Sequence, residues 1–360
     1  MASHILGIDI GSYSVKVLVA AAGFRQLELR EFAERIVPDG DGTHEERATK
    51  VLVDLVRERG WEHDFPYTTL PGDRVSMRVL EFGFAGLKRA DLDKAVGAEL
   101  EAELPQDLED IVYDFEPLRR DDPHKETRVP EAPGAQPVRE MRARTTVLAA
   151  AATRAEVSER LAAFARAGLE QPRAVIAAPT VYARVVEKIA AVRAAEGGAV
   201  LVVDHGHAHT NLCVVYNGRV VYARTLSRGG RHVTCAIAEA WSLPFADAER
   251  AKHTDGFVAS ANNPAPSTTW ARVSEVVSKT LVPLLREVRQ TLVACRAHTG
   301  IAPGIALVCG GGGRLRGFVE LLQEHLGIAV VTVGVDDGPH LLGRGQNVVA
   351  DTALLAHGLV

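Results

Sequence analysis

The stretch ILGIDIGSYSVKV, residues 5–17, decides the fold that we expect for this chain. An apolar strand, His4–Ile10, runs into the polar turn Gly11–Ser14, and a second apolar strand, Val15–Ala21, follows it. Leu27–Val37 alternates well enough between apolar and polar residues to be a third strand. Two strands joined by a glycine–serine turn form a hairpin, which differs from the strand-to-helix turn of a dinucleotide-binding fold.

The second half of the chain opens with the same device. Ala199–Asp204 is an apolar strand, His205–Thr210 is a tight turn, and Leu212–Tyr216 is another strand. The pair Asn217-Gly218 is a strong signal for a two-residue hairpin leading into a further strand, Arg219–Leu226. A hairpin that carries Asp-x-Gly at its tip therefore occurs twice, and this repetition is the most informative feature of the sequence.

The two copies of Asp-x-Gly lie at Asp9/Gly11 and at Asp204/Gly206. A glycine near small hydroxyl residues lets backbone N–H groups approach a phosphate, and the preceding aspartate suits a magnesium ion held through water. One such turn is also an ordinary hairpin with a polar tip, whereas two can face each other across a cleft and clamp a polyphosphate. In the first turn the donors would be Gly11, Ser12, Tyr13 and Ser14, with Lys16 adding a positive charge.

Two later stretches add to this pattern. The strand Ile305–Cys309 is followed by the glycine run Gly310–Gly313 and a helix, Phe318–Leu326, which is a usual way to bring backbone close to a flat ligand. A flexible loop is the alternative, and it explains four glycines between a buried strand and a helix poorly. Glu249 and Lys252 stand three apart and share one helical face, as an ordinary solvated ion pair also would.

Composition limits the class of protein. The chain has 360 residues, which suggests two domains or one large two-lobed domain. Its 46 acidic and 41 basic residues give a net charge of −5, which is not the electrostatic footprint of a nucleic-acid binder. The four cysteines show no Cys-x-x-Cys spacing, so neither a zinc site nor a disulfide framework is expected. No signal peptide and no run of about 18 apolar residues is evident, so we expect membrane association only through partners.

The remaining pattern predicts an alternation of helices and strands with one polar interruption. Residues 119–144 are rich in proline and charge, and we interpret them as a mobile loop because they hold too little apolar surface to offset the entropy of ordering. The other predicted elements are helices at Glu45–Arg59, Asp91–Leu104 and Arg154–Ala167, the last ending at Gly168, and strands at Arg74–Phe84, Ile111–Phe115 and Thr145–Ala152.

Taken in order, these motifs resemble the actin-like ATPase superfamily, and within it most closely the PilM and GspL family. The resemblance rests on GIDIGSYSVKV, ELEAELPQDLEDIVYDFEPL, VVDHGHAHTNLCVV with the following RTLSRGG, AERAK and VCGGGGRLRGF, and it spans about His4 to Ala356. It implies an α/β, actin-like (ribonuclease H-like) two-lobed fold with an FtsA/PilM-type inserted subdomain. The implied parts are a first lobe (1–74), the inserted subdomain (75–167), a connection back into the first lobe (168–198), a second lobe (199–335) and a C-terminal return (336–360).

The resemblance also implies a site for ATP and Mg²⁺. Asp9 and Asp204 would hold the hydrated metal. Gly11, Ser12, Tyr13, Ser14 and Lys16 would meet the phosphates from one side, and Gly206 and Thr210 from the other. Gly229 and Gly230 would lie near the ribose, Glu249 and Lys252 near the ribose and adenine, and Gly310, Gly311, Gly312 and Gly313 against the adenine and phosphates.

The implied function is that of an ATP-binding cytoplasmic scaffold, peripheral to the inner membrane, in the assembly platform of a type IV pilus or a type II secretion system. In such proteins a groove beside the inserted subdomain receives the cytoplasmic tail of a membrane partner, here PilN-like or GspM/GspF-like. We expect an extended apolar tail there, for which strand addition is one mode of binding. A pilus or secretion ATPase is a further expected partner, and self-association is compatible with the family. The chain ends in the apolar stretch Leu354–Val360, which suits a natural end or a chain cut before a membrane segment.

One departure from the hydrolases of the superfamily concerns Ala174–Tyr182, which contains no acid, amide or imidazole to position water. Such a group is typically worth ~10²–10⁴-fold in rate, so weak or absent ATPase activity is expected. A sugar or acid kinase and an FtsA-like filament protein are the alternatives within the superfamily. The alternating His205, His207 and His209 either fill a wet turn, or contact phosphate and sense pH, or form a metal cluster.

Overall fold

The chain divides into two compact units. The main unit comprises Met1–Arg74 and Val157–Val360, and the inserted unit comprises Val75–Glu156. The predicted C-terminal return, 336–360, and residues 121–143 of the predicted mobile loop lie outside the residues that the structure describes. The computed structural model describes residues 4–22, 27–61, 64–84, 86–120, 144–186, 188–194 and 198–333.

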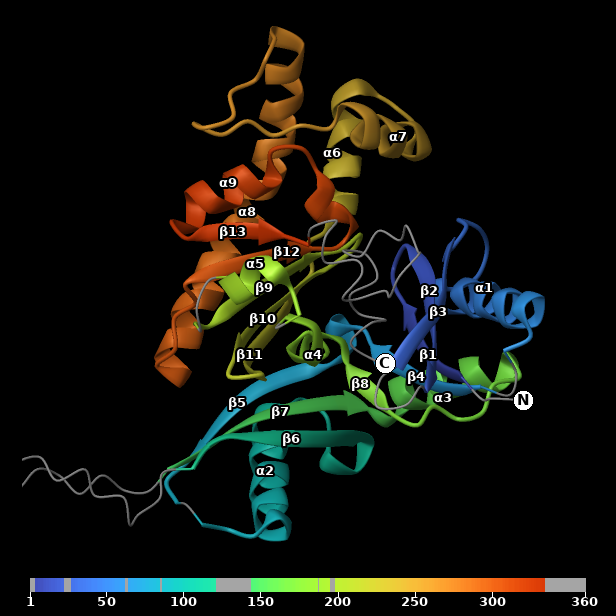
Figure 1. Cartoon of the computed structure of the whole chain (residues 1–360), viewed down its shortest axis with the longest axis vertical. Helices are drawn as coiled ribbons and strands as arrows, with labels where there is room; N and C mark the ends of the chain where they lie inside the picture. Colours follow the sequence, from blue (N-terminus) through green and yellow to red (C-terminus); the bar gives the residue numbers. More distant parts are fainter. Residues whose placement is uncertain are drawn as a thin grey trace, which may run out of the picture. The chain divides into compact units, whose positions relative to one another are not determined.

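The first sheet of the main unit is built around the hairpin quoted above. Its strand order is β3-β2-β1-β4-β8, with an antiparallel meander of three strands extended by two parallel ones. β1 is the central strand and its last five residues are buried, because both of its neighbours and a helical layer cover it (Figure 1). The strands are β1 (His4–Ile10), β2 (Ser14–Ala22), β3 (Leu27–Ile36), β4 (Phe65–Leu70) and β8 (Val175–Ala177).

The second sheet repeats this topology strand for strand. Its order is β11-β10-β9-β12-β13, and again the first three strands form an antiparallel meander and the last two are parallel. The repetition that the sequence predicts at the two hairpins is therefore a repetition of the whole sheet. The strands are β9 (Val200–His205), β10 (Thr210–Tyr216), β11 (Arg219–Leu226), β12 (Ile305–Cys309) and β13 (Ala329–Thr332). We call the first sheet and its helices lobe 1, and the second sheet and its helices lobe 2.

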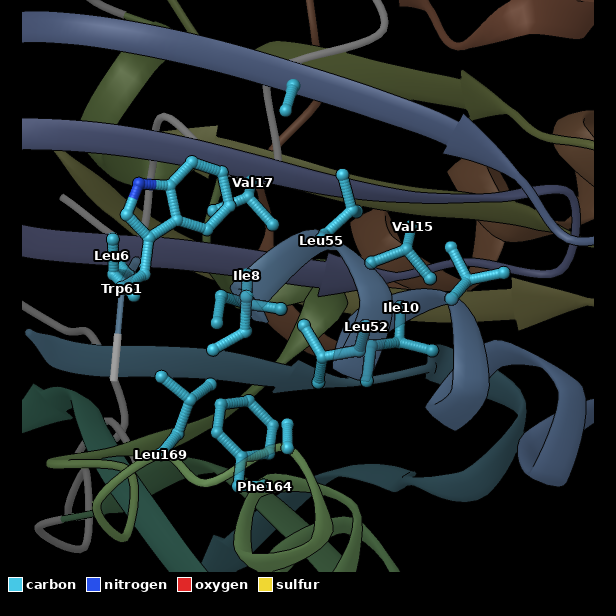
Figure 2. Packing of buried hydrophobic residues seen from close by; sticks show 14 of the residues in the cluster. Leu6, Ile8, Ile10, Val15, Val17, Leu52, Leu55, Trp61, Phe164 and Leu169 are labelled. Atoms are coloured by element: carbon cyan, nitrogen blue, oxygen red, sulfur yellow. The ribbon is translucent and has the colours of Figure 1, made fainter. Parts of the chain in front are cut away.

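The core of lobe 1 forms between its sheet and two helices, α1 (His44–Arg59) and α3 (Arg154–Arg166). Figure 2 shows Leu52 and Leu55 of α1 packed over the apolar side chains of β1 and β2, with Phe164 of α3 beneath them. A capping box at Thr43 starts α1, and Gly60 ends it with a φ of 70°. Since α1 is fixed at both ends and along one face, the hairpin above it has a rigid support.

Four longer helices belong to lobe 2. The turn between β10 and β11 has positive φ at both Asn217 and Gly218, as the two-residue hairpin signal predicts. The glycine run after β12 forms a short 3₁₀ turn, η4 (Gly311–Arg314), before the predicted helix. The helices are α6 (Gly230–Trp241), α7 (Phe245–Asp255), α8 (Thr268–Thr299) and α9 (Phe318–Leu326). The short helices α4 (Ala183–Val186) and α5 (Ala190–Ala194) and the 3₁₀ turn η3 (Ala178–Thr180) lie between the lobes in sequence.

The inserted unit has its own sheet and core. Its antiparallel strand order is β5-β7-β6, and one helix, α2, packs on the sheet and runs across the strand direction in Figure 1. Leu92, Val96 and Leu100 of α2 pack against apolar residues of all three strands. Its elements are β5 (Ser76–Phe82), α2 (Arg89–Glu103), the 3₁₀ turn η2 (Leu108–Asp110), β6 (Ile111–Arg120) and β7 (Thr145–Thr153).

Most predicted elements are present with shifted ends, and at the start of β5 a 3₁₀ turn replaces the first residues of the predicted strand. The sequence predicts a strand from Arg74 to Phe84, whereas β5 begins only at Ser76. Gly72–Arg74 form a 3₁₀ turn instead, η1, because Pro71 and Gly72 bend the chain and the Arg74 N–H bonds the Pro71 carbonyl at 2.9 Å.

Across the described part of the chain, none of the helices combines the length and apolar character that a membrane span requires.

Candidate functional site

The two Asp-x-Gly hairpins have the same geometry. In the first, Asp9 pairs with Lys16 in the strand register, and the N–H of Gly11 donates to the carbonyl of Ser14 at 3.1 Å. In the second, Asp204 pairs with Asn211, and the N–H of Gly206 donates to the carbonyl of His209 at 3.0 Å. The turns therefore have equal length, and Asn211 occupies the place in lobe 2 that Lys16 occupies in lobe 1.

The tips of the two hairpins meet. The backbone N–H of Ala208 donates a hydrogen bond to the Ser12 hydroxyl at 3.2 Å, and the ring centroids of Tyr13 and His207 lie 5.1 Å apart. We call the turns Gly11–Ser14 and Gly206–His209, taken together, the hairpin junction. It joins segments almost 200 residues apart in the sequence, so the lobes contact each other at this point.

The hairpin junction presents unused backbone donors. In the part of the chain that the structure describes, the N–H groups of Ser12, Tyr13, His207 and His209 have no hydrogen-bond partner in the protein. All four residues are partly exposed rather than buried. Successive free N–H groups in a turn form a concave donor surface that suits an anion, and here such surfaces occur on both tips.

Two aspartates lie at the base of the junction. Asp9 is 5% exposed, and its carboxylate accepts from Lys16 Nζ at 3.5 Å and from the Thr69 hydroxyl at 3.3 Å. Asp204 accepts from the Tyr182 hydroxyl at 2.6 Å and from the Asn211 side-chain amide at 2.9 Å. Burial raises the pKa of Asp204, the nearby charge of Asp9 raises it further, and the two hydrogen bonds and Lys16 oppose the rise.

The Asp9 and Asp204 carboxylates suit a divalent cation that is bound through water. Two carboxylates that repel each other across a partly buried space gain from a cation between them. Within the described residues, however, no group of three or more His, Cys, Asp or Glu side chains is gathered to ligate a metal directly. Asp9 and Asp204 would therefore hold a magnesium ion through its water shell and with phosphate oxygens, the mode that magnesium prefers.

Gly229 and Gly230 press against the second hairpin. The N–H of Gly230 donates to the Gly206 carbonyl at 2.9 Å, and a Cβ on Gly229 would lie 2.7 Å from the same oxygen. A Cβ on Gly230 would lie 3.7 Å from the Cα of Gly312. The backbone of three distant segments therefore converges here. Only glycine at position 229 permits this close approach, because any side chain there would collide with the backbone of the second hairpin.

His205 packs closely against two glycines of the glycine run, Gly310 and Gly312. A Cβ on Gly312 would lie 2.5 Å from Cδ2 of the His205 ring, and one on Gly310 would lie 2.8 Å from the His205 carbonyl oxygen. Gly310 also has a φ of 82°, which favours glycine. By contrast, a Cβ on Gly311 would meet nothing within 4 Å.

Glu249 and Lys252 form a compact polar cluster with Thr234 of α6. Lys252 Nζ lies 2.8 Å from a Glu249 oxygen, 2.9 Å from the Thr234 hydroxyl and 3.3 Å from the Gly230 carbonyl, and Thr234 donates to Glu249. Burial raises the pKa of Glu249, but the hydrogen bonds from Lys252 and Thr234 outweigh it and the net shift is downward. With side chains only 12% and 14% exposed, the pair is not the solvated surface pair that the spacing alone would allow.

Two predicted phosphate contacts have other partners. The Ser14 hydroxyl is buried and donates to Glu34 at 2.7 Å. The Thr210 hydroxyl is also buried and donates to the Arg228 carbonyl at 2.6 Å. In this structure both hydroxyls fix their hairpins to neighbouring strands and loops, whereas the Ser12 hydroxyl contacts the opposite hairpin tip.

The three alternating histidines have three different environments. His205 is buried, stacks on Phe318 at 5.0 Å between ring centroids, and has a pKa lowered to about 3, mainly by burial. Burial likewise lowers the pKa of His207, which faces Tyr13, to about 4. His209 lies 3.5 Å from Asp73 of lobe 1. The turn is thus neither a metal cluster nor simply a wet loop.

Several site residues were not predicted from the sequence. Asn211 could have been found by aligning the two hairpins, since both place a polar residue seven positions after the aspartate. Tyr182 follows the apolar connection between the lobes, and only the structure shows its hydroxyl at Asp204. Asp73 has no local motif, and its position beside His209 results from the η1 turn.

Solved structures share this fold. An ethanolamine utilization protein EutJ from Carboxydothermus hydrogenoformans covers 99% of this chain and 88% of its own, at 15% identity and a TM-score of 0.52. MreB 5 of Spiroplasma citri, solved bound to AMPPNP, covers 99% and 95% at 12% identity and a TM-score of 0.51. The duplicated sheets and the paired hairpins are those of the actin-like fold, as the sequence resemblance implied.

Within that class the match to one family is extensive. The model of the type IV pilus assembly protein PilM family matches residues 7–347, so the chain belongs to this family. A PilM-PilN type IV pilus biogenesis complex contains a chain that is 23% identical, with a TM-score of 0.77, and the alignment covers 100% of this chain and 97% of that one.

Proposed function

We propose that this protein is an ATP-binding scaffold of a type IV pilus assembly platform that captures the cytoplasmic tail of a PilN-like inner-membrane partner. Family membership over residues 7–347 and the similarity to a chain of a PilM-PilN complex support the pilus role. The nucleotide part rests chiefly on the hairpin junction, where both tips carry N–H groups that have no partner among the residues the structure describes.

The site residues take the following roles in this proposal. The free N–H groups of the junction and the charge of Lys16 bind the phosphates, and Asp9 and Asp204 hold the hydrated Mg²⁺. The close backbone approach of Gly229, Gly230 and the glycine run, beside the Glu249–Lys252 pair, forms the adenosine side. When bound, ATP and its metal ion supply the negative charge and the bridging cation that both hairpins recognise.

Turnover is expected to be slow. β8 and the turn after it carry no acid, amide or imidazole, and Tyr182 beyond them is fully buried with its hydroxyl donating to Asp204. Burial raises the pKa of Tyr182 well above its usual value, so this hydroxyl stays protonated and is no base for water.

The partner-binding role is assigned to the inserted unit. This unit has a separate core and a three-stranded sheet whose outer strands, β5 and β6, each offer one edge. An extended tail added to a sheet edge is a common mode of peptide capture. The protein would then act in the cytoplasm and reach the inner membrane through its partner.

Two measurements on the full chain test the proposal. Titration calorimetry with ATP and Mg²⁺ should show one site per chain, and a Lys16→Met variant should bind at least about tenfold more weakly because it loses one phosphate-facing charge. Co-purification with the cytoplasmic tail of the PilN homologue from the same genome should yield a complex. Absence of ATP binding, or phosphate release at ordinary enzyme rates of about 10 s⁻¹, contradicts the scaffold role.

A further inference from the structure

The 3₁₀ turn η1, Gly72–Arg74, contacts two parts of the main unit at once. On one side it lies against lobe 2. A Cβ on Gly72 would collide with the side-chain oxygens of Asn211 and Thr225, and the Asp73 carboxylate lies 3.5 Å from Nε2 of His209. His209 belongs to the hairpin junction, and Asn211 bonds Asp204. A movement of the second hairpin therefore displaces side chains that contact this turn.

The next residue, Arg74, faces lobe 1. Its guanidinium lies 2.8 Å from a Glu159 oxygen on α3 and 3.5 Å from a Glu45 oxygen in the first turn of α1. Arg74 is the last residue before the chain enters the inserted unit, and Glu159 is the third residue of the returning segment, which begins at Val157. The Arg74–Glu159 ion pair therefore ties together the two segments that connect the units.

Next to this ion pair lies a buried cluster of two charged side chains, Arg160 and Glu45, that have no hydrogen bond to each other. Arg160 is 1% exposed, and its Nη2 lies 3.6 Å from Oε1 of Glu45. Among the described residues, neither the Arg160 guanidinium nitrogens nor this Glu45 oxygen has a hydrogen-bond partner. A buried pair of this kind is stable only with close, well-oriented hydrogen bonds.

A small shift would satisfy the cluster. Charge-assisted N–H···O bonds are about 2.7–2.9 Å long, so a movement of about 0.8 Å between α3 and α1 would convert the Arg160–Glu45 contact into a hydrogen bond. The cluster would then have a second, better-bonded arrangement close to the one observed. An element with two discrete arrangements is what coupling between distant sites requires.

We propose that η1 and the cluster of Arg74, Glu45, Glu159 and Arg160 transmit closure of the hairpin junction around a nucleotide to the inserted unit. This inference rests on the proposed function, because ATP is the ligand that would close the junction. Gly72 and Asp73 contact the second hairpin and move with it. Arg74 then moves with them and displaces α1 and both segments that lead into the inserted unit. These are positioning residues, and ATP occupancy would thereby regulate the unit to which partner capture is assigned.

Hydrogen exchange on the full chain tests this coupling. ATP with Mg²⁺ should change the exchange rates of amides in α2 and β6 of the inserted unit by about fivefold or more, the lower end of usual coupling strengths. Arg74→Gln and Glu159→Gln should each retain ATP binding and lose most of this response. Glu58→Gln is the matched control, because Glu58 lies on the same helix as Glu45 and bonds Arg35 instead. It should keep both ATP binding and the response.

The outcomes separate the two proposals. If the wild-type chain binds ATP and the inserted unit does not respond, or if Arg74→Gln and Glu159→Gln respond like wild type, the coupling is wrong and ATP binding stands. If the wild-type chain binds no ATP, the proposed nucleotide function fails, and the coupling fails with it. Retained ATP binding in the variants also shows that they are folded.

Discussion

The Ser12 hydroxyl accepts a hydrogen bond from the backbone N–H of Ala208 at 3.2 Å, across a sequence separation of 196 residues. Ser12 lies at the tip of the first Asp-x-Gly hairpin and Ala208 at the tip of the second. A hydroxyl that accepts one hydrogen bond can still donate its own proton. This bond therefore holds the lobes together while leaving a donor and the neighbouring N–H groups directed to a ligand.

Ser12→Ala should weaken this contact. The N–H of Ala208 would lose its partner, and since the site is only partly buried we expect a loss of about 0.5–1 kcal/mol in the free energy of unfolding and weaker ATP binding. Thermal unfolding and calorimetry measure both effects. Ser227→Ala, at an exposed position just beyond β11, is the control and should change neither. Equal effects of the two substitutions would contradict a specific role for Ser12.

Gly312→Ala should impair the glycine run, while Gly311→Ala should not. A Cβ at position 312 would lie 2.5 Å from the His205 ring, which is buried and stacks on Phe318. Overpacking of this kind costs about 1–3 kcal/mol. At position 311 a Cβ meets nothing within 4 Å. Denaturant unfolding of both variants provides the comparison, and equal stabilities would show that the loop adapts freely.

Lys252→Met should destabilise the protein by about 1–3 kcal/mol, because it leaves the largely buried Glu249 carboxylate without its cation. A Lys252→Met/Glu249→Gln double variant should recover part of this loss, which a double-mutant cycle would measure as coupling. The control pair is Lys279–Glu275 on α8, whose side chains are 76% and 66% exposed. Its coupling should be much smaller, and comparable values for the two pairs would contradict the buried cluster.

Acidification should unfold the protein partly through His205. Its pKa in the folded state is about 3 against an ordinary 6.5, because burial and then the charges of Lys252 and His232 disfavour the protonated ring. Between these values the unfolded chain binds a proton that the folded chain excludes. Stability is therefore unaffected above pH 6.5 and falls below it, by up to about 1.4 kcal/mol per pH unit.

His205→Asn should flatten this pH dependence, at the cost of some stability at pH 7.5 from the lost stacking on Phe318. The midpoint of denaturant unfolding at pH 7.5, 6.0 and 5.0 gives the slope. His207, with a pKa of about 4, remains in the variant and contributes a residual slope. An unchanged slope would show that His205 does not titrate on unfolding.

The sequence predicts what is local and repeated. Both hairpins, the Asn217-Gly218 turn and the glycine run follow from short motifs whose conformation depends on neighbouring residues, and together they indicate an actin-like fold. Asn211 was also within reach, because it repeats the position of Lys16.

The structure was needed for what depends on packing between distant segments. The direction of the Ser14 and Thr210 hydroxyls is set by Glu34 and Arg228, which no local pattern links to them. The Arg160–Glu45 cluster likewise joins helices more than a hundred positions apart. Periodicity identifies α3 as a helix, but a buried arginine on it contradicts the usual preference of charged residues for the surface.

The insertion of Val75–Glu156 between β4 and β8 has a consequence for biosynthesis, because these two strands are neighbours in the first sheet. A ribosome adding about 5–20 residues per second needs several seconds to make the intervening stretch. During that interval the outer edge of β4 has no pairing strand, and such an edge can template aggregation. The inserted unit, which has a hydrophobic core of its own, can fold on the nascent chain before the sheet that flanks it is finished.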